Sequence, residues 1–241
     1  MANHDEVARG RRRFLQQSVA LIPLAAVATR GIAPSAAFAS ATPARGISAE
    51  AVPLWFNPGE WRFVVAACAR LIPEDDLGPG AVSEGVPVFI DRQMEQPYGY
   101  GQLWYMQPPF AEAIPELGYQ SSLVPRETYR RGIAAVDRYC QQQYHADFAD
   151  LTAAQQDEVL TGLEAGRING EQVPGALFFT QLLENTKEGY FADPQHGGNQ
   201  TLASWTLIGF PGARADYQDQ MDHPGQRYPL PPVSISGRRG A

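Results

Sequence analysis

The sequence predicts a mostly α-helical protein: an irregular helical domain with long ordered loops rich in glycine, proline and aromatic residues, and an extended C-terminal tail. In several separate segments apolar residues recur every three or four positions, which is the spacing of one helix face, whereas the alternation typical of strands is scarce. The 241 residues include 23 glycines and 20 prolines, so we expect much of the chain to lie in loops between short helices.

Two short helices are expected in the first half of the chain. In the segment 60–71 the apolar side chains fall on one helix face, and Pro73 closes the helix. A second helix is expected over 86–95, beginning at Pro87, because proline is tolerated at the first helical position. Cys68 lies on the apolar face of the first helix, where we expect it to be buried as a small hydrophobic residue.

Three further helices are expected in the second half. The segment 125–144 has apolar residues along one side of a helix. Thr152 caps the next helix, where Gln155 completes a capping box, and this helix continues to Gly166. Pro174 begins the last one, whose apolar positions again recur at three and four residues.

Two regions are predicted to be ordered without regular structure. The stretch PYGYGQLWYMQPPF, residues 97–110, holds five aromatic residues between glycines and prolines. Aromatic residues are common in cores and in interfaces, so this loop either covers the core or contacts a partner. The last fifty residues form an irregular tail, and its terminal RYPLPPVSI favours extended polyproline geometry.

The first 39 residues have the organisation of an export signal. Arg11 and Arg12, followed by Phe14 and Leu15, resemble the twin-arginine motif. The apolar run that follows is short and interrupted, whereas a membrane-spanning helix needs about 20 apolar residues. Ala37-Phe38-Ala39 then predicts cleavage between Ala39 and Ser40. The alternative interpretation is an uncleaved basic amphipathic anchor.

The predicted organisation of the chain is a twin-arginine signal peptide at 1–39, a linker at 40–58 and a helical domain at 59–241. Removal of the leader leaves 14 basic and 24 acidic residues, a net charge of −10. An acidic surface disfavours nucleic acid as a partner. Cys68 and Cys140 are too few for a disulfide scaffold; the sequence leaves open whether they pair, stay buried or bond to another subunit.

No catalytic, cofactor-binding or metal site is expected in this chain. The sequence lacks the C-x-x-C-H haem motif, a glycine-rich turn after an apolar strand, H-E-x-x-H and G-x-S-x-G. The three histidines beyond the leader have no ligand spacing. Asp193, His196 and Asn199 suggest a hydrolytic constellation, but without a nucleophile we favour turn bonding and capping.

The stretch EGYFADPQHGGNQTLASWTLIGFPGA, residues 188–213, resembles the gluconate 2-dehydrogenase subunit 3 family. The residues that carry this resemblance stand in order along the stretch: Asp193, Gly197, Gly198, Asn199, Trp205, Gly209, Phe210, Pro211 and Gly212. Earlier pieces, including ARLIPEDDLGPGA from Ala69 and FADLTAAQQDEVLTGLE from Phe148, agree with it. The resemblance therefore covers most of the chain beyond the leader.

The resemblance implies a non-catalytic small subunit of a membrane-associated, FAD-dependent sugar or sugar-acid dehydrogenase. Its partners would be a flavoprotein large subunit of the glucose-methanol-choline type, a multihaem cytochrome c and the twin-arginine translocase. FAD and haem c would belong to the partner subunits. The small subunit would fold onto the flavoprotein, escort it through the export pathway, and remain on the periplasmic face of the cytoplasmic membrane. The substrate of the complex is not fixed by this sequence.

Five aromatic residues are the candidates for partner contact, with internal packing as the alternative for each: Trp104, Tyr105, Tyr190, Trp205 and Phe210. The glycines of the motif are expected to permit tight turns, and Asp193 and Asn199 to satisfy loop backbone donors. Two other functions stay open from the sequence: a stand-alone periplasmic hydrolase using the Asp193/His196 loop, and a stand-alone binding or structural protein.

Overall fold

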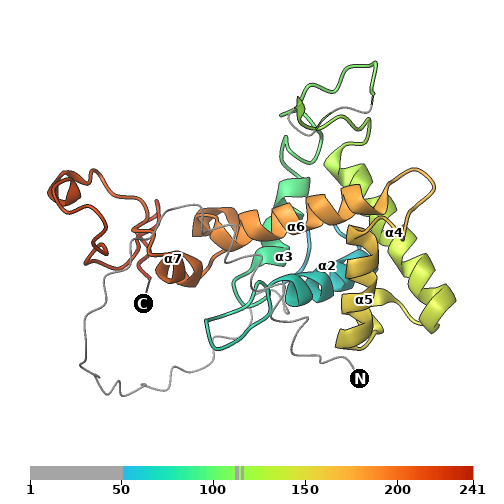
Figure 1. Ribbon diagram of the computed structural model, residues 1–241, viewed down its shortest axis with the longest axis horizontal. Helices are drawn as coiled ribbons and strands as arrows, with labels where there is room; N and C mark the ends of the chain where they lie inside the picture. Colours follow the sequence, from blue (N-terminus) through green and yellow to red (C-terminus); the bar gives the residue numbers. More distant parts are fainter. Residues whose placement is uncertain (1–50, 112–113, 115–116, 241) are drawn as a thin grey trace. The chain divides into compact units, whose positions relative to one another are not determined.

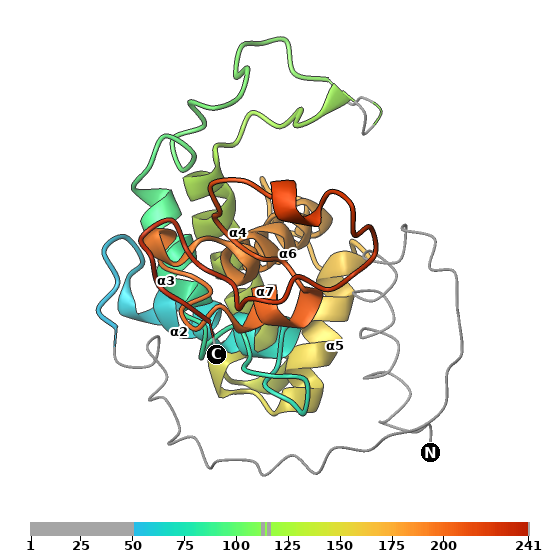
Figure 2. The ribbon, with the colours of Figure 1, turned by 90° about the vertical axis from the view of Figure 1, so that its left-hand side faces the viewer.

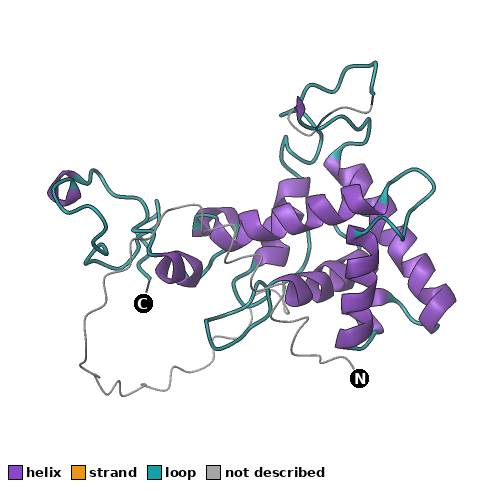
Figure 3. Cartoon of the chain, viewed as in Figure 1, coloured by secondary structure: helices purple, strands orange, loops and turns teal. Residues whose placement is uncertain are grey.

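The part of the chain that the structure describes forms six α-helices, five of which the apolar spacing of the sequence predicts. This structure is a computed structural model, and it describes residues 51–111, 114 and 117–240. Figure 1 labels the helices along the chain: α2 (Pro58–Leu71), α3 (Val86–Met94), α4 (Pro125–Tyr144), α5 (Ala153–Glu164), α6 (Gly175–Phe191) and α7 (Ala203–Ile208). Over these described ranges there are isolated β-bridges but no strand (Figure 3), so the prediction of a mostly α-helical fold is confirmed.

Two helices begin with a capping box, of which the sequence predicted the one of α5. The Asn57 side chain accepts a hydrogen bond from the Glu60 amide, and the Glu60 carboxylate accepts one from the Asn57 amide, each at 3.0 Å. Thr152 and Gln155 form the predicted capping box of α5. Helix α7 was missed, because six residues without a side-chain cap are too few to display a period.

Helix α6 is the centre of the core. It packs against α2, α3, α4, α5 and α7 (Figures 1 and 2). The buried Phe178 ring of α6 lies 5.9 Å from the Phe63 ring of α2 and 5.6 Å from the Tyr129 ring of α4, measured between centroids. Gly132 lets α4 approach closely, because a Cβ atom there would lie 2.4 Å from Phe178 Cγ. Aromatic rings on three helices thus interlock around one side chain.

The segment just before α2 is held by a buried carboxylate. Asp91 on α3 accepts hydrogen bonds from three successive amides: Leu54 N at 2.6 Å, and Trp55 N and Phe56 N at 3.0 Å each. The Phe56 side chain is buried in the core. Residues 51–57, which fall in the range predicted as a linker, are therefore fastened to the helical domain.

The two cysteines are free thiols inside the domain. Both Cys68 and Cys140 are fully buried and neither forms a disulfide, so the expected burial of Cys68 is confirmed. Burial raises the pKa of each thiol to about 12. Both groups are therefore neutral at physiological pH and act as small apolar side chains.

The leader lies outside the described residues, and with it Arg11, Arg12, Ala39 and Ser40. Everything that the structure describes belongs to one unit, Thr42–Ala241. Among those described residues, none of the helices combines the length and the apolar character needed to cross a membrane.

We predict that Asp91→Ala lowers the free energy of unfolding by about 2–4 kcal/mol, because three backbone amides lose a charged acceptor and one of them is buried. Chemical denaturation of the purified chain measures this. Glu164→Ala, at an exposed position at the end of α5, is the matched control and should change the stability by less than about 0.5 kcal/mol. Equal stability of the two variants would contradict the role given to Asp91.

Candidate functional site

The motif that carries the family resemblance begins directly after α6 and joins distant backbone segments. Asp193 accepts one hydrogen bond from Gln195 N, at 3.1 Å, within its own turn. Its second oxygen accepts one from Ile235 N, at 2.7 Å, in the C-terminal tail. Asn199 is buried; its amide donates to Ala192 O and its oxygen accepts from the Ser204 hydroxyl. Asn199 thus satisfies a backbone acceptor, and the expectation that it would serve backbone donors is wrong.

Two glycines of the motif allow contacts that no other residue permits. Gly198 lies against α6, where a Cβ atom would stand 1.9 Å from Gly189 O. Gly212 has a φ of +79°, and a Cβ atom there would stand 2.1 Å from Val233 O. Beside it, Pro211 O accepts a hydrogen bond from Val233 N, at 3.3 Å. The motif therefore holds the tail on one side and α6 on the other.

The other two glycines of the motif end short helical turns. Gly197 follows the 3-10 turn Pro194–His196, and Gly209 follows α7. Both have left-handed backbone conformations. The sequence predicts tight turns at the glycines of the motif, and Gly197 and Gly209 both lie in such turns.

A buried carboxylate that the sequence gave no reason to single out completes this arrangement. Glu84 is fully buried and accepts hydrogen bonds from both the amide and the hydroxyl of Thr201. Its backbone oxygen accepts a further bond from Gln200 N, at 3.3 Å. More than a hundred residues separate the partners, and no local pattern links them, so sequence reasoning had no signal for this contact.

Two of the five candidate aromatic residues are buried inside the chain. The Trp205 indole donates to Phe191 O at 2.8 Å, and the Tyr190 hydroxyl donates to Pro79 O at 2.8 Å. Burial, with Glu84 nearby, raises the pKa of Tyr190 to about 12. Both residues therefore act in internal packing, which was the alternative weighed for them.

The other three aromatic candidates reach the surface. Phe210 is exposed and meets the buried Trp205 ring edge-on, with centroids 4.9 Å apart. Trp104 is half-buried, and the neighbouring Tyr105 is almost fully exposed. These three side chains can contact a partner without rearrangement of the core.

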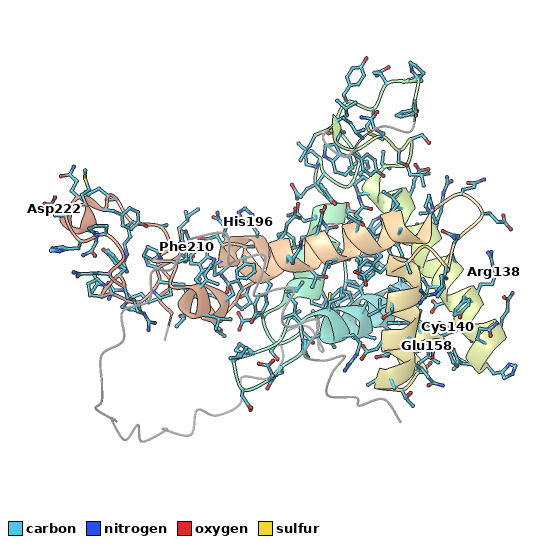
Figure 4. All side chains as sticks on the ribbon, viewed as in Figure 1. Arg138, Cys140, Glu158, His196, Phe210 and Asp222 are labelled. Carbon is cyan, nitrogen blue, oxygen red and sulfur yellow. The ribbon has the colours of Figure 1, made fainter. Side chains whose placement is uncertain are left out.

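Helix α7 presents an apolar edge. Leu207, Ile208 and Phe210 are all exposed there, while Trp205 fixes the helix to the end of α6. We call these three residues the α7 edge. Figure 4 shows Phe210 on this part of the chain and His196 near the end of α6. Neighbouring apolar side chains at a fixed site are typical of protein–protein contacts.

The Asp193 and His196 side chains, which were considered for a hydrolytic site, make other contacts in the structure. The described residues contain no group of three or more His, Cys, Asp or Glu side chains arranged to hold a metal ion. Both Asp193 oxygens are used by backbone amides, and the His196 Nε2 atom lies 3.2 Å from the Gln195 side-chain nitrogen. Asp193 is therefore engaged in holding the backbone rather than in orienting the His196 ring.

An open hollow of about 580 Å³ lies beside α2, with Trp61, Val65 and Ala69 in its lining. Its charged groups are already engaged. Arg62 forms an ion pair with Asp150, and Glu74 accepts a hydrogen bond from Ser83 at 2.7 Å. The hollow therefore presents mainly apolar surface.

The fold and the motif together define a class of protein: a helical protein in which motif residues such as Asp193 and Asn199 hold backbone segments in place. A protein-family model, gluconate 2-dehydrogenase subunit 3, matches residues 58–212, which is more than half of the chain. The chain therefore belongs to this family, as the stretch 188–213 predicted. Neither the curated proteins nor the solved structures gave a match.

We predict that Gly198→Ala destabilises the protein by about 1–3 kcal/mol, because the added methyl group would collide with Gly189 O. Thermal or chemical unfolding measures the change. Gly59→Ala is the control, since a Cβ atom in that first turn of α2 meets only Asn57 Oδ1 at 3.4 Å. It should leave the stability unchanged or raise it by up to about 1 kcal/mol. A Gly198→Ala variant as stable as the control would refute the close contact.

Proposed function

We propose that this protein is a non-catalytic subunit of a dehydrogenase complex of the gluconate 2-dehydrogenase type, and that it binds the flavoprotein subunit that oxidises the substrate. The match of residues 58–212 to the subunit 3 family carries this proposal. Membership of a family of third subunits points to work within a complex, and the partner subunits would hold FAD and haem c.

The chemistry of the motif supports binding rather than turnover. Asp193 and Asn199 of the motif, and Glu84 outside it, are committed to hydrogen bonds with backbone groups or neighbouring side chains. Apolar side chains, by contrast, are offered to the outside on the α7 edge, which Trp205 keeps in place. A surface on a helix that is already held in place loses less conformational entropy on association than a mobile segment would.

Export through the twin-arginine translocase forms part of the same proposal. Arg11 and Arg12 supply the twin-arginine pair, and the pathway accepts folded proteins. A leader on the small subunit would then serve both proteins, because the flavoprotein would cross while bound to it. The complex would act on the periplasmic face of the cytoplasmic membrane and pass electrons to a multihaem cytochrome c.

The alternative of a hydrolase using Asp193 and His196 gains no support from the geometry. Ile235 N and Gln195 N occupy the carboxylate, so the pair lacks the arrangement in which an acid orients a general base. A stand-alone binding protein would have the same fold, and the experiment below separates it from a subunit.

The test is purification of the tagged full chain from its native cells, followed by an absorption spectrum and an assay with sugar acids and an artificial electron acceptor. We predict that a flavoprotein co-purifies and that the pair oxidises gluconate or a related substrate, whereas the chain alone has no activity. As a matched control for export, an Arg11→Lys/Arg12→Lys variant should retain the pair in the cytoplasm.

A colourless, monomeric chain would overturn the proposal. A flavin bound to the isolated chain would overturn the assignment of FAD to the partner. If the lysine variant were exported as efficiently as the wild type, the twin-arginine route would be wrong, while the role as a subunit would still stand on co-purification.

A further inference from the structure

The segment between α3 and α4 forms a second exposed apolar surface, separate from the α7 edge. Figures 1 and 2 both show it leaving the helices as an open loop. We call its described residues, 97–111, 114 and 117–124, the aromatic arm. Six of its large apolar side chains are exposed: Tyr100 by 48%, Leu103 by 67%, Tyr105 by 82%, Phe110 by 37%, Ile114 by 61% and Leu117 by 65%. Such exposure on neighbouring parts of one loop marks an interaction site.

The base of the aromatic arm is fixed by a buried hydrogen-bond network. The Tyr98 hydroxyl donates to Asn185 Oδ1 on α6, at 3.1 Å, and the Tyr129 hydroxyl of α4 donates to the same atom, at 3.0 Å. Asn185 Nδ2 also donates to Glu188, at 3.0 Å. Because a buried amide is costly to leave unpaired, this network fixes where the arm begins.

Aromatic and cationic contacts stiffen the aromatic arm above its base. Trp104 lies between two rings, with its centroid 5.5 Å from that of Tyr98 and 4.4 Å from that of Tyr119. The Tyr119 hydroxyl donates to Leu123 O, at 2.6 Å, close to the start of α4. Arg126 lies 4.4 Å from the centre of the Tyr100 ring. These contacts connect the segment of the arm that follows α3 with the segment that precedes α4, and both with α4 itself.

We propose that the aromatic arm is a docking site for the flavoprotein subunit, and that Leu103 and Tyr105 enter an apolar groove on that partner. This inference rests on the proposed function and adds to it the surface by which this protein would bind the flavoprotein. The inference depends on a contrast within the arm. The Trp104 and Tyr119 rings pack against each other, whereas the neighbouring Leu103 and Tyr105 side chains are exposed to solvent. A braced loop with protruding apolar groups binds at a low cost in conformational entropy.

The charge of the aromatic arm favours a protein partner over a lipid surface. Its described stretches hold no Lys, Arg, Asp or Glu, and the only charged residues anywhere in 97–124 are Glu112 and Glu116. Attachment to anionic lipid relies on Lys and Arg. A second copy of the chain is also disfavoured, because each copy carries a net charge of −7 and the two repel each other.

The experiment uses the full chain and the flavoprotein that co-purifies with it. We expect a Leu103→Ser/Tyr105→Ser variant to bind this flavoprotein at least about ten-fold more weakly than the wild type, as for the loss of two central anchors. Leu77→Ser is the matched control, since this leucine is 59% exposed on a turn outside the arm, and it should bind as the wild type does. Because all three side chains are exposed, the circular dichroism and melting temperature of both variants should match the wild type.

Each other outcome overturns the inference in a recognisable way. If the double variant binds the flavoprotein as tightly as the wild type, the arm is not the docking site although the proposed function stands. If the wild type binds no flavoprotein, both fail. Light scattering that shows a wild-type dimer dissociated by the double substitution would assign the arm to a second copy. Arm-dependent flotation with phosphatidylglycerol vesicles would assign it to a membrane.

Discussion

The buried side chain of Asn185 on α6 connects the parts of this protein that matter for binding. It accepts hydrogen bonds from Tyr98 at the base of the aromatic arm and from Tyr129 on α4. One turn further along α6, Gly189 lies against Gly198, and Tyr190 bonds to Pro79. The same helix thus positions the aromatic arm near its middle and the family motif at its end. Binding surfaces placed in this way depend on one packed core.

The sequence was informative wherever the cause of a structure is local. Capping pairs such as Thr152 with Gln155 act over three residues, and the apolar spacing of each long helix records which face is buried. Long-range polar contacts left no such trace. Asp91 with the amides of residues 54–56, and Glu84 with Thr201, join segments that no local pattern relates, so their carboxylates look like ordinary surface acids in the sequence.

The same limit explains the outcome for the candidate aromatic residues. Composition identified loops rich in Trp, Tyr and Phe, but these residues are enriched in cores and interfaces alike. Only the fold separates Tyr190 and Trp205, which are buried, from Tyr105 and Phe210, which are exposed. In one case a buried ring supports an exposed one, because the Trp205 ring meets the Phe210 ring edge-on.

Hydrogen–deuterium exchange of the full chain, alone and in its complex with the flavoprotein, tests most directly whether this protein works by presenting fixed surfaces to a partner. We predict that exchange slows on binding in the aromatic arm and around the α7 edge, while the amides of α6 stay equally protected in both states. Unchanged exchange at both surfaces would contradict this claim, because the partner would then bind elsewhere. Protection of α6 that appears only on binding would also contradict it, because the partner would then reorganise the core.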